Sequence, residues 1–565
     1  MFCSVQSAAI SGVEVIPVSV EVDVNSGMPY FSMVGFVSSQ VKEAQERVRT
    51  AIRNLGMSIP PKRITVNLAP GSVRKEGTRF DLPIAVAILE ALGSIRPETF
   101  GKMMIIGELH LDGSVQGIAG VLPSVIRARD LGCHTCIIPA ANLAEGRAVE
   151  GMRIIGIRHL KDLISLDQGK PVPDEKTFGE SAVNCIGDRA GGEYTEHSAD
   201  GAATGEHADG STDDKAVGGY AGFRPDDMAV EAVVRREASR KDFSDIHGQS
   251  AVKRAAVIAA AGFHNLLLSG PPGSGKSMAA ERIPTIMPRL SPSESLEISQ
   301  IYSIVGLLPP GVALMTERPF RAPHHTITGA ALCGGGINPK PGEITLAHRG
   351  VLFLDELPEM APSTAEMLRQ PLETHRITIA RSGGTCTFPA SFLLVAAMNP
   401  CPCGCFPDMN RCTCTPKMIM SYQARVSQAL LDRIDLRCDV PAASYEDLAD
   451  TSPDPVSSAV MREKVMRVLD IQKERYRGRY ILFNSELGAS DIRRFCSLTG
   501  EAERMMESAF RSLGLSARGY HHAMRVSRTI ADLEGSDTIH EACVSEALCF
   551  RSRENDEVQR MFAGH

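Results

Sequence analysis

A glycine-rich stretch in the middle of the chain has the residue types and the spacing that bind a phosphate group. It follows the apolar run 264–268 and precedes the helix-permissive segment 278–282, so a strand, a loop and a helix succeed one another. Its residues are Gly270, Pro271, Pro272, Gly273, Ser274, Gly275, Lys276 and Ser277. Glycines let backbone N–H groups close around a phosphate, and the N-terminus of the following helix points its positive end at the same anion.

The last two residues of this loop add specific chemistry. The ammonium group of Lys276 suits the β- and γ-phosphates, and the hydroxyl group of Ser277 suits Mg²⁺. A chance glycine turn would not require a strand and a helix in register on its two sides. The stretch therefore predicts a nucleotide site with ATP and Mg²⁺ as its ligands.

Two carboxylates and an amide end two further apolar runs. Residues 350–354 are apolar on both faces, as in a central parallel strand, and Asp355 and Glu356 follow them. Asp355 can hold Mg²⁺ through its water shell, and Glu356 can polarise the water that attacks the γ-phosphate. Asn399 ends the run 392–398, where open α/β sheets bind ligands. The alternative is that Asn399 only caps the turn at Pro400, but its position favours orienting the water or sensing the γ-phosphate.

Cysteines are concentrated on one loop that is rich in Pro and Gly. Pairs of thiolates at this density suit tetrahedral Zn²⁺, although C-x-C is tighter than the common C-x₂-C spacing. The predicted ligands of this structural zinc ion are Cys401, Cys403, Cys412 and Cys414, and Cys405 is spare.

Two adjacent histidines, His324 and His325, could also suggest a metal. Adjacent side chains on a strand or loop point apart, so we expect these two to be structural or polar-loop residues.

The composition favours a cytoplasmic globular protein of several domains. The length of 565 residues suggests about three or four domains, and an apolar fraction of 43% is ordinary. No apolar run approaches the roughly 18 residues of a membrane span, and residues 1–7 do not read as a signal peptide. We therefore expect no membrane partner, and cysteines that are thiols or metal ligands rather than disulfides.

An acidic segment separates two folded parts. Residues 171–220 hold eleven Asp or Glu against three Lys or Arg, a difference that exceeds the net charge of −7 of the whole chain. The remainder is near neutral, so net charge neither supports nor excludes nucleic acid as a partner. We predict a low-complexity linker over 169–235, because the segment is too poor in apolar residues to fold.

The strands and helices on each side of this linker predict an α/β protein with three folded parts. Residues 1–168 mix strands with helices and predict a compact α+β domain. Residues 236–443 predict an ATPase core around a parallel sheet, and residues 444–565 predict a helical lid domain.

The N-terminal part resembles the Lon-protease-type domain at the front of Mg-chelatase-like proteins. In a Lon-type protease a serine and a lysine form the catalytic pair, and the matching stretches here are 75–81 and 119–124. Arg79 lies where the serine would be and Leu122 where the lysine would be. A guanidinium cannot attack a carbonyl and a leucine cannot take a proton, so we expect no proteolysis. Assembly or partner contact is the expected role of this domain.

Residues 318–326, 334–343, 346–350 and 399–404 closely resemble the Mg-chelatase-like YifB/ComM family of AAA+ ATPases. With the Lon-like front domain, this resemblance covers nearly the whole chain apart from the linker. It implies a homo-hexameric ATPase, and in ComM members a DNA helicase that drives branch migration during transformation.

The family also implies roles for two arginines. Residues 430–436 resemble the segment that carries the arginine finger of ring-forming AAA+ ATPases. Arg433 would stabilise transition-state charge on a neighbouring subunit's γ-phosphate, with Arg425 as the alternative. Arg518 matches the second-sensor arginine. The alternative is a surface arginine, although the dipole at a helix N-terminus disfavours a cation there.

Two loops are candidates for contact with DNA. Residues 377–388 read as two short strands around a Gly-Gly turn, and such a hairpin projects into the pore of related ring ATPases. Arg381 beside its tip could contact phosphate without regard to sequence. The 334–342 loop would be a second pore element, with Lys340 as its charge. The alternative is that both are ordinary exposed loops.

These observations predict a cytoplasmic AAA+ ring ATPase that uses MgATP hydrolysis to move single-stranded or branched DNA. The alternatives are a chaperone-like remodeller of a protein partner, a chelatase-type motor subunit and an ATP-dependent protease. The missing Ser/Lys pair disfavours the last of these.

Overall fold

The computed structural model describes residues 1–170, 174–175, 241–336, 338–381, 384–442 and 456–551. Nearly all of the predicted linker, 169–235, lies outside these ranges, as do residue 443 of the predicted core and residues 444–455 and 552–565 of the predicted lid. Strand β10, Asp174–Glu175, pairs with a strand of the N-terminal sheet. The sheet therefore takes two residues from the segment predicted as linker.

An eight-stranded mixed sheet forms the N-terminal part, in the order β10-β9-β8-β5-β1-β2-β4-β3. Apart from β10 its strands are β1 (Phe2–Ser11), β2 (Glu14–Asn25), β3 (Tyr30–Val34), β4 (Arg63–Ala69), β5 (Met104–Ile105), β8 (Thr135–Pro139) and β9 (Arg153–Ile157). The long strands β1 and β2 form an antiparallel hairpin, whereas β5, β8 and β9 run parallel to one another.

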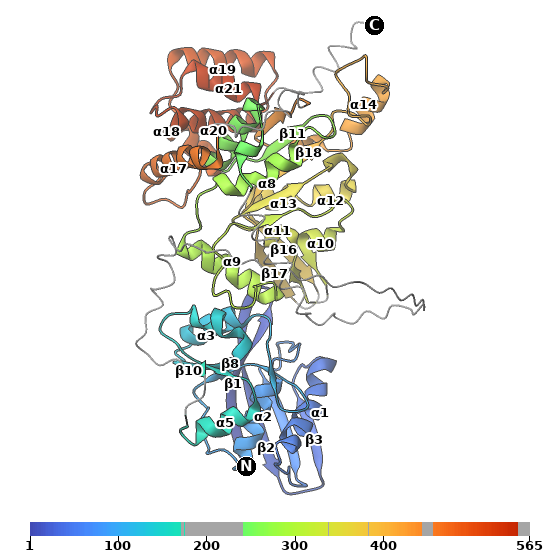
Figure 1. The fold of residues 1–565 in the computed structure, drawn as a ribbon, viewed down its shortest axis with the longest axis vertical. Helices are drawn as coiled ribbons and strands as arrows, with labels where there is room; N and C mark the ends of the chain where they lie inside the picture. The colour runs from blue at the N-terminus through green and yellow to red at the C-terminus, as the bar shows by residue number, and fades with distance from the viewer. Residues whose placement is uncertain (171–173, 176–240, 337, 382–383, 443–455, 552–565) are drawn as a thin grey trace, which may run out of the picture. The chain divides into compact units, whose positions relative to one another are not determined.

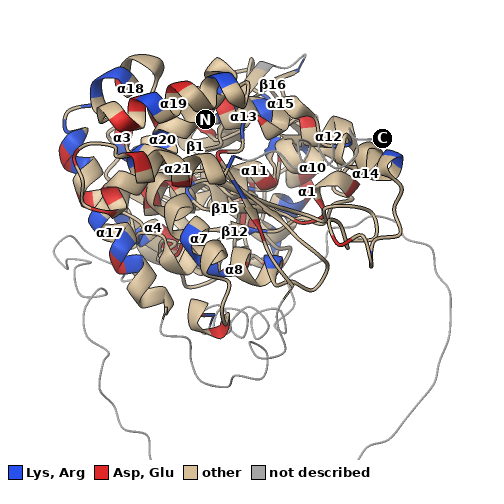
Figure 2. Cartoon of the chain, turned by 90° about the horizontal axis from the view of Figure 1, so that it is seen from above, with Lys and Arg blue, Asp and Glu red and all other residues tan. Residues whose placement is uncertain are grey.

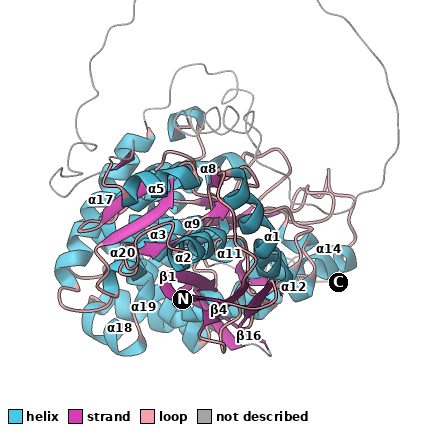
Figure 3. Cartoon of the chain, turned by 90° about the horizontal axis from the view of Figure 1, so that it is seen from below, coloured by secondary structure: helices cyan, strands magenta, loops and turns pink. Residues whose placement is uncertain are grey.

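Helices pack on this sheet around two apolar clusters, one with α1, α2 and α5 and the other with α3 and α4, and Figure 3 colours helices and strands by type. They are α1 (Ser39–Asn54), α2 (Asp81–Ala91), α3 (Val121–Asp130), α4 (Leu143–Arg147) and α5 (Leu160–Asp167), with a small hairpin of β6 (Glu108–Leu109) and β7 (Val115–Gln116). Helix α1 buries only the face that carries Val41, Ala44, Val48, Ala51 and Ile52. Its apolar residues recur at helical spacing, which is why that helix could be predicted. Helix α2 is buried along its whole length.

A second sheet has five strands that are all parallel, in the order β12-β15-β18-β11-β19. They are β12 (Phe320–Arg321), β15 (Val351–Leu354), β18 (Leu393–Met398), β11 (Leu266–Ser269) and β19 (Leu436–Asp439). Every residue of β11, β15 and β18 is buried, as the continuous apolar runs predict. The predicted parallel sheet is therefore confirmed, and its carboxyl ends meet at one edge.

The connections of this sheet contain helices and two hairpins. The helices are α7 (Ser250–Gly262), α8 (Lys276–Ile286), α9 (Pro292–Val305), α10 (Gly329–Cys333), α11 (Glu343–Leu346), α12 (Pro362–Glu366), α13 (Arg369–Thr374), α14 (Pro416–Gln423) and α15 (Gln428–Leu431). The hairpins pair β13 (Gly334–Gly335) with β14 (Lys340–Pro341), and β16 (Arg376–Arg381) with β17 (Gly384–Pro389). The second of these is the hairpin expected over residues 377–388.

The C-terminal part is helical (Figure 1). It contains α17 (Ser458–Arg475), α18 (Ala489–Phe495), α19 (Gly500–Ser512), α20 (Ala517–Leu533) and α21 (Glu541–Cys549). Their buried residues share one apolar core with α7 and α8, so this helical part packs against the part that contains the parallel sheet. Basic and acidic residues are interspersed along α17, α18 and α19, as the colours of the ribbon in Figure 2 show. Among the described residues, no helix combines the length and the apolar character needed to cross a membrane.

Candidate nucleotide site

The phosphate-binding loop lies between β11 and α8, where the sequence predicts it. A Cβ atom on Gly270 would lie 2.2 Å from the carbonyl oxygen of Val440, so only glycine fits there. Gly273 and Gly275 have φ of +77° and +88°, in the left-handed region that glycine adopts without strain. The loop therefore lies close against the residue that follows β19.

Lys276 is buried and its ammonium group is held by the loop itself. Its Nζ donates to the carbonyl oxygens of Gly270 and Pro271, each at 2.7 Å. Nζ also lies 3.3 Å from Oδ1 of Asn399 at the end of β18. Burial lowers the pKa of Lys276, and the nearby Asp355 carboxylate opposes this shift. The structure thus brings together the predicted lysine and the predicted amide, which are far apart in the sequence.

Ser277 and Asp355 also meet at this edge of the sheet. Oγ of Ser277 donates to Oδ2 of Asp355 at 2.9 Å, and Asp355 directly follows β15. A hydroxyl and a carboxylate side by side are oxygen ligands of the kind that Mg²⁺ binds beside phosphates. The pair can therefore hold the metal of a MgATP complex.

Glu356 follows Asp355 in a strained backbone conformation. Its φ is +50°, which a residue with a Cβ adopts at a cost of about 1 kcal/mol or more. This conformation turns the chain sharply after β15, and the Glu356 side chain remains half exposed. The carboxylate is therefore accessible to a water molecule near the phosphate loop.

His325 is a site residue that sequence reasoning missed. Its Nδ1 lies 2.9 Å from Oε2 of Glu356. The expectation that His324 and His325 point apart is wrong, because their ring centroids are only 4.1 Å apart. The loop after β12 turns within this pair, so the alternation of an extended strand does not apply. The one available signal was the place of both residues in the motif 318–326 that resembles the family.

The two predicted arginines do not join the phosphate loop of their own chain. Arg433, between α15 and β19, and Arg518, in the first turn of α20, both donate to Glu373. The alternative finger, Arg425, pairs instead with Glu359 at 2.8 Å on the surface. Arg433 and Arg518 therefore form a separate cluster with an acidic residue that the sequence did not single out.

The two candidate DNA contacts lie at the ends of the short hairpins. Arg381 is the last residue of β16 and is exposed, and it pairs with Gly384 in the register of the hairpin. Residues 382–383, between the two strands in the sequence, lie outside the described residues. Lys340 begins β14 and is also exposed.

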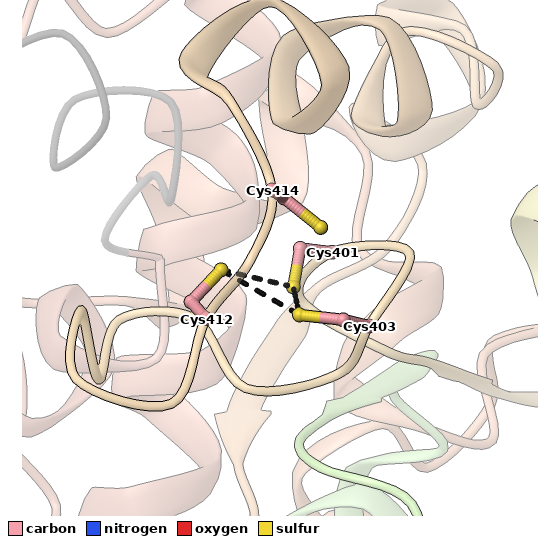
Figure 4. A group of neighbouring side chains, drawn as sticks. All are labelled: Cys401, Cys403, Cys412 and Cys414. Atoms are coloured by element: carbon pink, nitrogen blue, oxygen red, sulfur yellow. Dashed lines mark hydrogen bonds between the residues drawn. The ribbon is translucent and has the colours of Figure 1, made fainter.

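The four predicted zinc ligands come together on the loop after β18 (Figure 4). Sγ of Cys401 lies 3.4 Å from that of Cys403 and 3.8 Å from that of Cys412. All four ligand atoms, including that of Cys414, lie within 4.8 Å of one another. Four thiolates around one Zn²⁺ are separated by about 3.8 Å, given Zn–S bonds of about 2.3 Å in a tetrahedron. The arrangement therefore fits zinc.

Groups around the cluster reinforce this fit. The backbone N–H of Phe406 donates to Sγ of Cys401. Cys405 itself directs its thiol to the carbonyl oxygen of Cys403, consistent with its place as the spare residue. Every cysteine in the described part of the chain is free of disulfides.

The cysteine loop also packs against the phosphate loop. A Cβ atom on Gly404 would lie 2.3 Å from Cδ of Pro272, so the two loops touch at a position that only glycine can occupy. A change in the conformation of the cysteine loop would therefore alter the position of the phosphate loop.

In the N-terminal part, the positions of the absent protease pair are buried. Arg79 donates to the carbonyl oxygen of Ala8 and to Oγ of Ser124, and burial lowers its pKa to about 10. Leu122 lies in an apolar cluster. Neither side chain offers a nucleophile or an exposed base.

The sequence matches three family descriptions along its length. Residues 20–142 match "Subunit ChlI of Mg-chelatase", residues 242–448 match "Magnesium chelatase, subunit ChlI", and residues 455–551 match "Magnesium chelatase, subunit ChlI C-terminal".

Two proteins are similar over nearly the whole chain. Competence protein ComM of Haemophilus influenzae is 38% identical over 551 residues, which cover 97% of each chain. Protein YifB of Escherichia coli is 37% identical over 548 residues, which cover 97% of this chain and 96% of that one. Lon protease 2 of Bacillus subtilis is 28% identical over 141 residues, 25% of each chain.

Proposed function

Because the chain belongs to the Mg-chelatase-like YifB/ComM family, we propose that it is a ring-forming AAA+ ATPase that moves DNA. Its reaction would be MgATP hydrolysis in the cytoplasm, and the work would be to move single-stranded or branched DNA, as in branch migration. The family matches support an AAA+-type ATPase. The name of the ComM relative, a competence protein, motivates DNA as the substrate.

One observation carries the ATPase part of this proposal, namely that groups from three parallel strands converge. The loop after β11 leads to Lys276 and Ser277 at the start of α8, the end of β15 brings Asp355, and the end of β18 brings Asn399. Ligands bind at this edge in open α/β sheets. Lys276 would bind the phosphates, and Ser277 and Asp355 would hold Mg²⁺.

The remaining roles concern the attacking water and the assembly. Glu356 would accept a proton from the water, and Asn399 would orient it beside the γ-phosphate. Among the described residues, the polar partners of Arg433 and Arg518 do not include the phosphate loop, which supports their acting on the site of a neighbouring subunit in a homo-hexamer. A ring whose sites are completed by the neighbour would couple hydrolysis in successive subunits.

A DNA-stimulated ATPase assay tests the substrate. ATP turnover should rise when forked or four-way-junction DNA is added to the purified chain. The rival is a remodeller of protein partners or a chelatase-type motor, which the magnesium chelatase descriptions favour. Turnover that is indifferent to every DNA structure would support that rival.

Arg381→Ala should weaken DNA binding about equally for all sequences. If Arg381 meets phosphate, its removal should reduce the salt slope by about one unit for each phosphate that the protein no longer neutralises. ATP hydrolysis without DNA should survive, because Arg381 lies on the hairpin and outside the phosphate loop. Fluorescence anisotropy with labelled junction DNA at several salt concentrations measures both effects.

A matched control is Arg376→Ala, which removes an exposed arginine from the other end of the same strand. The control should bind DNA like wild type. If Arg381→Ala also binds and unwinds junction DNA like wild type at every salt concentration, the DNA path lies elsewhere.

We further propose that Cys401, Cys403, Cys412 and Cys414 bind a structural Zn²⁺ ion. Cys412→Ser should abolish the expected content of about one zinc ion per chain. ATP affinity should fall with it, because the cysteine loop supports Pro272 of the phosphate loop. Elemental analysis of the purified chain measures the metal, and nucleotide titration measures the affinity.

The control for this experiment is Cys405→Ser on the same loop, which should keep both zinc and ATP affinity. Wild-type protein purified without metal, or a Cys412→Ser variant with wild-type zinc content, would refute the zinc site. A zinc-free variant with normal ATP affinity would refute only the contact between the two loops as a route to the nucleotide.

A further inference from the structure

Two arginines from distant segments share one carboxylate oxygen. Nη2 of Arg433 donates to Oε1 of Glu373 at 2.6 Å, and Nη2 of Arg518 donates to the same oxygen at 2.7 Å. Two guanidinium groups repel each other at this separation unless an anion lies between them. Glu373 is therefore the group that holds them together in this structure.

Local structure explains how the three side chains meet. Glu373 is the penultimate residue of α13. His375, which follows the helix, has a left-handed backbone conformation with φ of +54°. Arg433 lies in the turn between α15 and β19, and Arg518 in the first turn of α20. A cation in that first turn is disfavoured by the helix dipole, so Arg518 depends on an external anion for its stabilisation.

These residues line one pocket of about 370 Å³. The charged and titratable groups in its wall are Glu373, His375, Arg433, Asp435, Glu486, Arg518, His521, His522 and Arg525. Burial lowers the pKa values of His375 and His521, which favours their neutral forms. Asp435 is matched by His522, with which it pairs. The cationic character available to a ligand therefore resides in the three arginines.

The pocket has unused capacity for an anion. The side chain of Arg433 is only 8% exposed, and its Nε is buried with no hydrogen-bond partner among the described residues. The Glu373 side chain is 43% exposed. When an anion displaces it from the arginines, its carboxylate can therefore turn into solvent and stay hydrated. A phosphate group has more acceptor oxygens than one carboxylate and could satisfy both guanidinium groups at once.

We propose that Glu373 is a positioning residue that binds Arg433 and Arg518 in the isolated subunit. On assembly, the two arginines would exchange Glu373 for the γ-phosphate of ATP bound to a second copy of the chain. This inference rests on the proposed ring. Glu373 thus competes with the incoming phosphate, so subunits associate firmly only when the neighbour carries ATP rather than ADP. The carboxylate makes assembly selective for the nucleotide state.

The test is assembly of the full chain with two nucleotides. Glu373→Gln removes the competing charge, and it should lower the ATPγS concentration for half-maximal assembly about three- to fivefold. Assembly in ADP should remain as weak as that of wild type, because ADP presents no γ-phosphate. Sedimentation velocity measures assembly, and thermal unfolding checks that the variant is folded.

Two further variants separate a direct contact from a general change of charge. Glu486→Gln removes a carboxylate from the same pocket wall whose side chain accepts a hydrogen bond from the backbone of Leu482. Its effect on ATPγS-driven assembly should be clearly smaller. In the Arg433→Ala background, the effect of Glu373→Gln should shrink, since one of the two released guanidinium groups is absent.

The outcomes distinguish this inference from the proposed function. If wild-type protein assembles with ATPγS but Glu373→Gln shifts ATPγS and ADP alike, or shifts neither, the competing role is refuted and the ring stands. An increase in the ATPγS concentration required would equally refute competition. If wild-type protein does not assemble with ATPγS, the ring itself is refuted, and the role of Glu373 with it.

Discussion

Glu356→Gln should stop ATP turnover while leaving ATP bound. The amide has nearly the shape of the carboxylate but cannot accept a proton from the attacking water, so we expect turnover to fall about 10²-fold or more. Nucleotide affinity should be nearly unchanged, because the phosphate contacts come from the loop around Lys276. Steady-state phosphate release and titration with a fluorescent ATP analogue measure the two quantities.

Two other variants bracket this result. Lys276→Ala should weaken nucleotide binding itself, because it removes the buried ammonium group of the phosphate loop. Glu359→Gln alters a carboxylate three residues away that pairs with Arg425 on the surface, and it should hydrolyse ATP like wild type. Wild-type turnover in Glu356→Gln would remove Glu356 from the mechanism. His325, 2.9 Å from Glu356, would then be the next group to test.

The ATPase core could be predicted because its signals are local. Strands β11, β15 and β18 are continuous apolar runs, and each leads directly into the polar residues that carry chemistry. A buried parallel strand needs such a run, and its carboxyl end is where a ligand binds. The positions of Lys276, Asp355 and Asn399 therefore follow from reading each segment by itself.

The N-terminal sheet could be predicted only in part. The alternation in β2 and the helical spacing in α1 are local, but β5 has two residues and is defined only by its neighbours. The pairing of β10 with β9 likewise depends on tertiary contacts, since two acidic residues at the start of a linker favour no strand. Such pairing has no signature in a single segment.

Contacts between distant side chains were the least predictable part of the site. Glu373 lies in a short helix, and nothing in its own segment points to Arg433 or Arg518. His325 was not expected in the site, because adjacent side chains on a strand or loop were expected to point apart. The turn after β12 brings the rings of His324 and His325 together instead. By contrast, the spacing of the four cysteines was sufficient, because two close pairs on one loop can meet with little help from the rest of the fold.

Arg433→Ala should reduce ATP turnover about 10³-fold or more if the guanidinium stabilises transition-state charge on a neighbouring subunit. Nucleotide binding to the isolated subunit should persist, because Arg433 lies in the pocket around Glu373 and not at the phosphate loop. Arg433→Lys should also be impaired, since an ammonium group cannot reproduce the planar fork of donors. Arg425→Ala, the exposed alternative, should retain activity. Thermal unfolding of each variant separates an effect on chemistry from an effect on stability.

Mixed assemblies decide whether Arg433 acts on a neighbour. Arg433→Ala subunits keep an intact phosphate loop, and Lys276→Ala subunits keep an intact arginine. In head-to-tail rings formed from equal amounts of both, about a quarter of the interfaces combine the two intact groups, so part of the activity should return. If Arg433 acts within its own chain, no interface is complete and mixing restores nothing. Absence of recovery in rings verified to contain both subunits would therefore refute action in trans, and the same mixing with Arg425→Ala would test the alternative finger.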